Sequence, residues 1–292
     1  MIIVTGATGQ LGRASVEHLL ERVPASEVGV SVRDPERAQD LADRGVRVRR
    51  GDFTEPSTLA AAFEGATQVL LVSGPAGAES HVAAVDAAVA AGARRVVYTS
   101  HMAAGATPAP VFMPAVGHAE TERHLERSGV AWTALRDGFH AISALHMLGR
   151  GVETGELRLP EGGPVCWTAQ DDLGVAAAVA LTAPERLSGT TPPLTGSELL
   201  DMDEVADVVA ELTGRPLRRT TVSDEDFLAE LVAGGTPEAY APLALTFFTA
   251  GRRGDFAVTD PTLAELLGRE PVRLRDVLAA QLGVAAPAGA GA

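Results

Sequence analysis

The feature that most constrains this chain is a glycine-rich stretch placed directly after its first apolar segment. Residues 1–5 form a short apolar run. The residues that end this run or follow it are Thr5, Gly6, Thr8, Gly9, Gln10, Leu11 and Gly12. Apolar residues then recur at helical spacing, which predicts a strand, a tight turn and a helix. Glycines in such a turn let backbone N–H groups approach a pyrophosphate, and the helix N-terminus favours the anion. These seven residues are therefore predicted to bind a dinucleotide; the alternative is an ordinary glycine-rich turn.

Strand and helix patterns alternate along the first half of the chain. The expected strands after the first are Val28–Val32, Val46–Arg50, Gln68–Val72, Arg95–Ser100 and Ala131–Leu135. The expected helices between them follow Leu11, start at Asp34, and cover Pro56–Phe63, Ser80–Ala91 and Gly117–Ser128. This alternation predicts an α/β fold of the Rossmann type, a doubly wound parallel sheet with helices on both faces.

The alternation of strands and helices becomes less regular beyond about residue 150. Residues 1–150 are predicted to form the NAD(P)-binding domain. Residues 151–284 are predicted to form a smaller, mostly helical region that covers the substrate and is closely integrated with the first domain. The helices expected there are Asp171–Leu181, Met202–Leu212, Asp224–Val232, Pro237–Thr249 and Leu274–Leu282, with a strand at Leu217–Val222. Residues 285–292 contain only Ala, Gly, Pro and are expected to be disordered.

Charge and composition exclude several classes of function. The formal net charge is −14, which argues against nucleic acid or an acidic membrane surface as a partner. The start of the chain shows no basic segment and no long apolar run, so we expect a cytoplasmic protein. Cys166 is the single cysteine, which excludes an internal disulfide framework. All 24 basic residues are arginine, so no mechanism can use a lysine.

Further cofactor contacts are predicted at the carboxyl ends of the strands, where ligands bind in open α/β sheets. Arg33 follows the second strand, where a guanidinium can pair with a 2′-phosphate and favour NADP(H), with NAD(H) possible; the alternative is a solvated arginine. Asp34 is better suited to capping a helix that starts with Pro35. The remaining candidates at strand ends are Asp52, Phe53, Ser73 and Ser100.

Several segments together resemble one known family. They include residues 5–12, 32–35, 51–53, 98–100, 118–122, 128–130 and 135–139, and Asp172. The chain resembles the NmrA-like branch of atypical short-chain dehydrogenases, in particular the type-2 NAD(P)H:quinone oxidoreductases. The resemblance is specific through about residue 175. It implies an NAD(P)H-dependent reductase without flavin or metal, acting on a quinone or a polycyclic aromatic substrate.

One segment departs from the pattern of the quinone reductases. Where they usually read Asn-Gly-Trp-Tyr, this chain has Asp137, Gly138, Phe139 and His140. The family implies that this segment lies near the nicotinamide and the substrate. Asp137 and Phe139 are therefore predicted to line the substrate pocket, together with Met102 and Phe248, although a core role for the phenylalanines is the simpler reading.

The proton-transfer groups of short-chain dehydrogenases are missing. If His118 occupies the lysine position of the Tyr-x-x-x-Lys relay, the tyrosine position holds Pro114. Alcohol oxidation through that relay is excluded, whereas a quinone accepts hydride readily and needs less assistance. His118, His101 and His140 are the candidate catalytic residues, each with a structural role as the alternative. The histidine spacings form no metal motif, so no metal is expected.

These observations leave two classes of function open. The first is the quinone reductase, which in aromatic polyketide pathways could be the reductase part of a flavin- and metal-free hydroxylation (monooxygenase), with a partner protein. The second is a non-catalytic NAD(P)-sensing regulator, as the regulatory NmrA proteins are. An epimerase of the extended dehydrogenase group needs the Tyr/Lys relay and is set aside.

Overall fold

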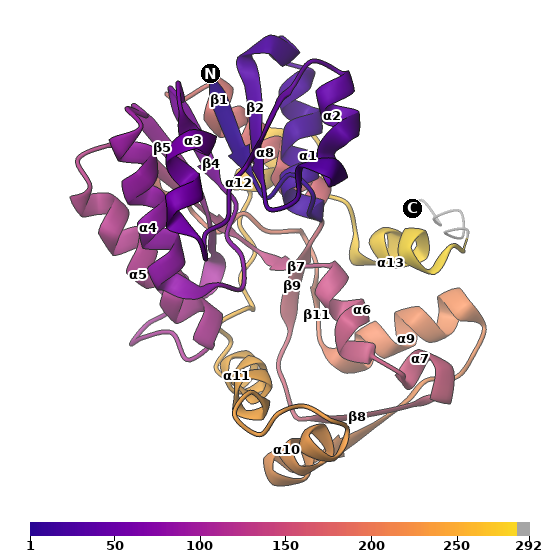
Figure 1. Ribbon diagram of the computed structural model, residues 1–292. Helices are drawn as coiled ribbons and strands as arrows, with labels where there is room; N and C mark the ends of the chain where they lie inside the picture. The colour runs from indigo at the N-terminus through magenta and orange to yellow at the C-terminus, as the bar shows by residue number, and fades with distance from the viewer. Residues whose placement is uncertain (285–292) are drawn as a thin grey trace.

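A seven-stranded parallel sheet forms the centre of the protein in the computed structural model, which describes residues 1–284 (Figure 1). The strand order is β10-β6-β5-β4-β1-β2-β3, and every neighbouring pair is parallel. The strands are β1 (Ile2–Thr5), β2 (Val28–Val32), β3 (Arg47–Arg50), β4 (Gln68–Leu71), β5 (Arg95–His101), β6 (Ala131–Asp137) and β10 (Gly189–Thr190). The chain reverses its direction of winding between β1 and β4, which is where such sheets bind ligands.

Helices cover both faces of this sheet because its strands are apolar on both sides. One face packs against α1 (Gln10–Leu20), α2 (Gln39–Asp43), α8 (Gln170–Thr182) and α12 (Thr262–Leu267). The other face packs against α3 (Leu59–Phe63), α4 (Gly77–Ala90) and α5 (Met113–Arg127). The predicted Rossmann-type fold is confirmed. The cap at Asp34 is also confirmed, since its carboxylate accepts the N–H of Glu36 at 3.1 Å.

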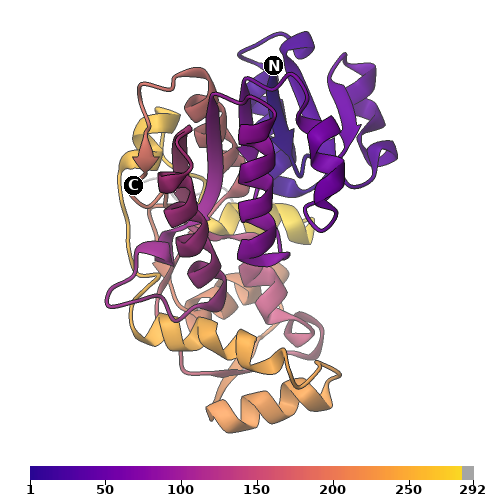
Figure 2. The ribbon, with the colours of Figure 1, turned by 60° about the vertical axis from the view of Figure 1, so that its left-hand side comes forward.

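A second lobe lies beneath the sheet, on the side to which β1 points (Figures 1 and 2). It contains a sheet of order β11-β9-β7 and a parallel pair β12-β8. Its elements are β7 (Phe139–His140), α6 (Ile142–Leu148), α7 (Gly151–Thr154), β8 (Glu156–Pro160), β9 (Val165–Thr168), β11 (Leu199–Leu200), α9 (Met202–Thr213), β12 (Arg218–Val222), α10 (Asp224–Ala233), α11 (Ala241–Arg252) and α13 (Leu274–Leu282). Strands β8 and β9 are absent from the sequence-based prediction, because each is short and gains its partners from distant segments.

Parts of the chain beyond residue 150 return to the first lobe. Helix α8 packs along α1, and β10 pairs with β6. The buried carboxylate of Asp172 at the start of α8 accepts hydrogen bonds from Arg269 at 2.6 Å and from the N–H of Val272 at 2.7 Å. This carboxylate therefore fixes the late segment of the chain to the sheet's helical layer.

Within residues 1–284, no helix is both long and apolar enough to cross a membrane. The predicted tail, residues 285–292, lies outside the described residues.

Candidate functional site

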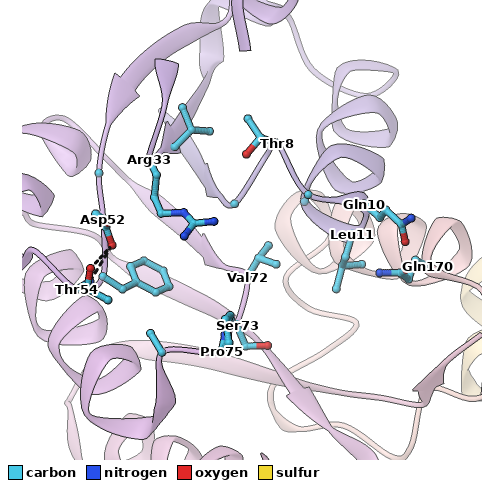
Figure 3. A pocket seen from close by; sticks show the side chains of 18 of the residues that line it. Thr8, Gln10, Leu11, Arg33, Asp52, Thr54, Val72, Ser73, Pro75 and Gln170 are labelled. Atoms are coloured by element: carbon cyan, nitrogen blue, oxygen red, sulfur yellow. Dashed lines mark hydrogen bonds between the residues drawn. The ribbon is translucent and has the colours of Figure 1, made fainter. Parts of the chain in front are cut away.

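A cavity of about 560 Å³ opens at the carboxyl edge of the sheet, beside the turn between β1 and α1 (Figure 3). Nineteen residues line it, and they come mostly from the loops that follow β1, β2, β3 and β4. They are Gly6, Thr8, Gly9, Gln10, Leu11, Gly12, Val32, Arg33, Gly51, Asp52, Phe53, Thr54, Val72, Ser73, Gly74, Pro75, Ala76, His140 and Gln170. The cavity therefore lies where the sheet topology predicts a ligand.

The glycine-rich turn forms one wall of this cavity. Gly6 has a φ of +64°, a conformation that side chains disfavour. A Cβ on Gly12 would overlap the carbonyl oxygen of Gly6 and lie 2.6 Å from its carbonyl carbon, so only glycine lets α1 approach the turn this closely. Gly9 is the N-cap of α1 and supplies no side chain to the first-turn N–H groups. Those N–H groups are thus available to an anion such as a pyrophosphate.

Arg33 reaches into the cavity from the end of β2 (Figure 3). Its guanidinium makes no salt bridge within residues 1–284. Opposite lies Asp52, whose Oδ1 accepts hydrogen bonds from the backbone N–H and the hydroxyl of Thr54, at 2.9 and 2.8 Å. These bonds, the backbone one first, hold the pKa of Asp52 below its ordinary value. The carboxylate therefore stabilises the turn formed by residues 52–54.

Two predicted cofactor residues, Thr5 and Ser100, do not line the cavity. Thr5 accepts the N–H of Val72 at 2.9 Å and ties the end of β1 to that of β4. Ser100 is turned toward α5 and donates to Glu122 at 2.6 Å. Glu122 in turn pairs with Arg136 at 2.8 Å, so Ser100 belongs to a buried polar cluster behind the sheet. Ser73, by contrast, lines the cavity.

Two lining residues, His140 and Gln170, come from beyond the first five strands. Gln170 is the first residue of α8, and Figure 3 shows its amide beside Gln10 and Leu11. Sequence reasoning did not identify Gln170, because helix α8 reaches the site only through its packing on α1. The other lining residues that it missed, including Thr54, Gly74 and Ala76, lie within three positions of predicted ones.

A cluster of imidazoles and one phenol adjoins the cavity wall. The N–H of Gly74, a lining residue, donates to Nε2 of His81 at 3.1 Å. The hydroxyl of Tyr98 is 3.2 Å from Nδ1 of His81 and 2.8 Å from Nδ1 of His118. The His101 ring stacks against that of His118 with centroids 6.1 Å apart. Two predicted catalytic residues, His101 and His118, are thus brought together, although neither lines the cavity itself.

Burial keeps these histidines uncharged. It lowers the pKa of His118 to about 3 and that of His140 to about 4, and it holds the pKa of His101 well below its ordinary value. Neighbouring imidazoles add to the effect at His101 and His118. The three side chains are therefore neutral hydrogen-bonding groups at physiological pH.

Asp137 lies at the end of β6, opposite His101 in the strand register. It is 2% exposed, and its Oδ1 has no hydrogen-bond partner among the described residues. Burial raises the pKa of this carboxyl well above its ordinary value and so favours its protonated form. Asp137 does not line the cavity but stands beside the imidazole cluster.

The predicted aromatic pocket is mostly core. Six of the eight phenylalanines and one tryptophan belong to an apolar cluster of the second lobe. Phe248 is buried against Phe227 and Phe247 and does not line the cavity. Phe139 and the half-buried Phe112 instead contact His101, with ring centroids 5.5 and 5.2 Å away. Met102 is buried at the start of the turn that follows β5.

Within residues 1–284, no three His, Cys, Asp or Glu side chains gather as metal ligands would.

The fold and the cavity together define a dinucleotide-binding protein of the Rossmann type, and comparison with known proteins narrows the class. A family model described as NAD(P)H-binding matches residues 6–142. Quinone oxidoreductase 2 of Escherichia coli is 30% identical over 280 residues, 94% of this chain and 96% of that protein. An NAD(P)H azoreductase of Xenophilus azovorans is 33% identical and covers 82% of this chain, which in turn covers 84% of it.

Solved structures agree with this result. The E. coli NADPH-dependent quinone oxidoreductase complexed with NADPH superimposes with a TM-score of 0.87, covering 97% of this chain and 100% of that one at 30% identity. Triphenylmethane reductase of Citrobacter sp., complexed with NADP(H), gives 0.83 at 32% identity, with 95% and 99% coverage. The chain belongs to the NAD(P)H-binding NmrA-like family and is close to quinone oxidoreductase 2. It is an NAD(P)H-dependent oxidoreductase of the quinone reductase type.

Proposed function

We propose that this protein is an NADPH-dependent reductase whose substrate is a quinone or another flat, conjugated aromatic acceptor. The observation that carries the proposal is one cavity walled by the glycine turn and Arg33, with a neutral imidazole cluster hydrogen-bonded to its wall through Gly74 and His81. Its relatives support the proposal, since they include a quinone reductase, an azoreductase and a triphenylmethane reductase, each named for a conjugated acceptor.

The residues that line the cavity suit the pyrophosphate and the 2′-phosphate of NADPH. Gly6, Gly9 and Gly12 would hold its pyrophosphate at the start of α1, where the N–H groups are uncapped. Arg33 has no salt-bridge partner in the described part of the chain and would pair with the 2′-phosphate. The bound cofactor would supply the hydride, and the nicotinamide is expected beside His140 and Gln170.

The acceptor would lie against the surface formed by Phe112, Phe139 and the imidazoles of His101 and His118. Aromatic rings favour a flat conjugated ligand through stacking and edge contacts. The one buried tyrosine, Tyr98, is 0% exposed, and its pKa is raised by burial, so it cannot take a proton from an alcohol substrate. These features favour reduction of a carbonyl-type acceptor over oxidation of an alcohol.

The test is NADPH consumption with and without naphthoquinones and anthraquinones, run in air and under nitrogen. Consumption that requires the acceptor and persists under nitrogen supports the reductase. Oxygen uptake coupled to an oxygenated aromatic product would support a narrower proposal. In it the protein is the reductase that initiates a hydroxylation, together with a partner protein. Tight NADPH binding with no consumption would contradict the reductase and favour the sensor.

A further inference from the structure

The hydrogen bonds around Tyr98 fix where each imidazole carries its proton. A backbone N–H can only donate, so Nε2 of His81, which faces the N–H of Gly74 at 3.1 Å, must be an acceptor. A neutral imidazole has one N–H, and in His81 it is therefore on Nδ1. That group donates to the hydroxyl oxygen of Tyr98, 3.2 Å away.

The same logic extends to His118. The Tyr98 hydroxyl has a single hydrogen, and when it points to Nδ1 of His118, 2.8 Å away, that nitrogen is the acceptor. Nδ1 of His118 is then unprotonated, and the ring proton is on Nε2. If Nδ1 of His118 carried the proton instead, both histidines would donate to the Tyr98 oxygen. The hydrogen of the Tyr98 hydroxyl would then bond to neither histidine.

A separate backbone contact sets the tautomer of His101. The N–H of Ala103 donates to Nδ1 of His101 at 3.1 Å, so this ring also carries its proton on Nε2. The planes of the His101 and His118 rings are inclined by only 25°, and each residue keeps a small part of its surface exposed. Nε2 of neither ring makes a hydrogen bond within residues 1–284. Two N–H groups without a hydrogen-bond partner in the described part of the chain thus belong to neighbouring rings, whose centroids are 6.1 Å apart.

We propose that Nε2–H of His101 and Nε2–H of His118 form a donor pair for the substrate oxygen that gains negative charge during reduction, with Tyr98 and His81 as positioning residues. This inference rests on the proposed reductase function. Two N–H···O bonds of roughly 2.9 Å each can bridge donors up to about 6 Å apart. Preorganised donors aimed at developing charge are a large source of rate enhancement in a site that excludes water.

The reaction balances without a proton from either ring. Hydride transfer to a quinone forms one new bond to hydrogen and leaves one anionic oxygen, and solvent water then supplies the proton that completes the hydroquinone. The donor pair stabilises the anion between these events and ends unchanged. Because Gly74 both lines the cavity and donates to His81, the positioning of His118 is linked to the wall of the cofactor site.

The groups that face the pair keep its charge constant over a wide pH range. They are Tyr98 on β5, His81 on α4, His140 on β7 and Asp137 at the end of β6. Burial favours the neutral form of all four, and the anionic Glu122 on α5 is paired with Arg136.

The first test is imidazole nitrogen NMR on the full chain without cofactor, from pH 5 to 8. We expect His101 and His118 to be neutral throughout, each with its proton on Nε2. The Tyr98→Phe variant should lose this preference at His118 only, while Tyr240→Phe, which alters the other and exposed tyrosine, should leave it unchanged. A proton on Nδ1 of His118, or titration of either ring near pH 6.5, would overturn the inference.

The second test is the rate of quinone reduction. His118→Leu should lower kcat about 100-fold with little change in KM for NADPH, as loss of one such donor does. His118→Gln keeps an N–H near the position of Nε2 and should recover much of that loss, and Tyr98→Phe should cost about tenfold because it acts only through His118. Equal rates for His118→Leu and wild type would refute the donor role. Absence of reduction by the wild type would refute the proposed function, and NMR would still report the tautomers separately.

Discussion

Replacing Arg33 by alanine should weaken the binding of NADPH and leave the binding of NADH nearly unchanged. Arg33 lies at the end of β2 with its guanidinium in the cavity, and it stabilises no other part of the described chain through a salt bridge. The Arg33→Ala variant should therefore fold normally. What it loses is a charged partner for the phosphate that distinguishes the two cofactors.

The magnitude follows from the exposure of the site. A hydrogen bond to a charged group is worth about 1.5 to 3 kcal/mol. Arg33 is exposed, so solvent and salt screen the pair and the lower part of that range applies. A loss of about 1.5 kcal/mol corresponds to a rise in Kd for NADPH of roughly tenfold.

The assay is calorimetric titration of both cofactors at two salt concentrations. Arg37→Ala is the matched control, because Arg37 lies four residues further on, outside the cavity. We expect the Arg33 effect on NADPH to shrink at high salt, and Arg37→Ala to bind both cofactors as the wild type does. Equal losses of NADPH and NADH affinity in Arg33→Ala would refute this assignment.

Two further predictions concern the glycine turn and the buried acid. Gly12→Ala should abolish binding of both cofactors, because its Cβ would overlap the backbone of Gly6. Gly162→Ala is the control, since its Cβ would make an ordinary 3.5 Å contact with Phe248. Calorimetric titration of both variants with NADPH and NADH measures the difference in binding. Asp137 has a raised pKa in the folded state, so the unfolded chain binds fewer protons above about pH 4 and stability falls as pH rises. The free energy of unfolding of Asp137→Asn should not show this fall. Its difference from the wild type should grow by about 1.4 kcal/mol per pH unit from pH 4 upward, until the carboxyl of the folded wild type ionises. Urea unfolding at several pH values measures this difference, and a difference that does not change with pH would contradict the prediction.

The first lobe could be predicted from sequence because its signals are local. The glycine turn, the strand Val28–Val32 and the cap at Asp34 each depend on residues within a few positions, and the structure places them as expected. Arg33, Asp52, Phe53 and Ser73 could be predicted as cavity residues for a related reason, since they follow strands whose parallel arrangement was evident.

The imidazole cluster could not be predicted in the same way. His81 carried no signal of its own, and its contact with Tyr98 joins α4 to β5 across 17 residues. The missing Tyr-x-x-x-Lys relay indicated that the proton chemistry had changed, but spacing along one helix could not show which groups replaced it. Gln170 and strands β8 and β9 were missed because long-range packing, and no local pattern, brings them into place.

The most direct test of the central claim is a single-turnover experiment without oxygen, in which the protein with one equivalent of NADPH is mixed with excess naphthoquinone. The account predicts that the nicotinamide absorbance disappears in one phase, that one hydroquinone forms for each NADPH, and that deuterium on the transferred position of NADPH slows the phase. If NADPH binds but its absorbance remains unchanged with every quinone offered, the protein is not a reductase of this class of acceptor.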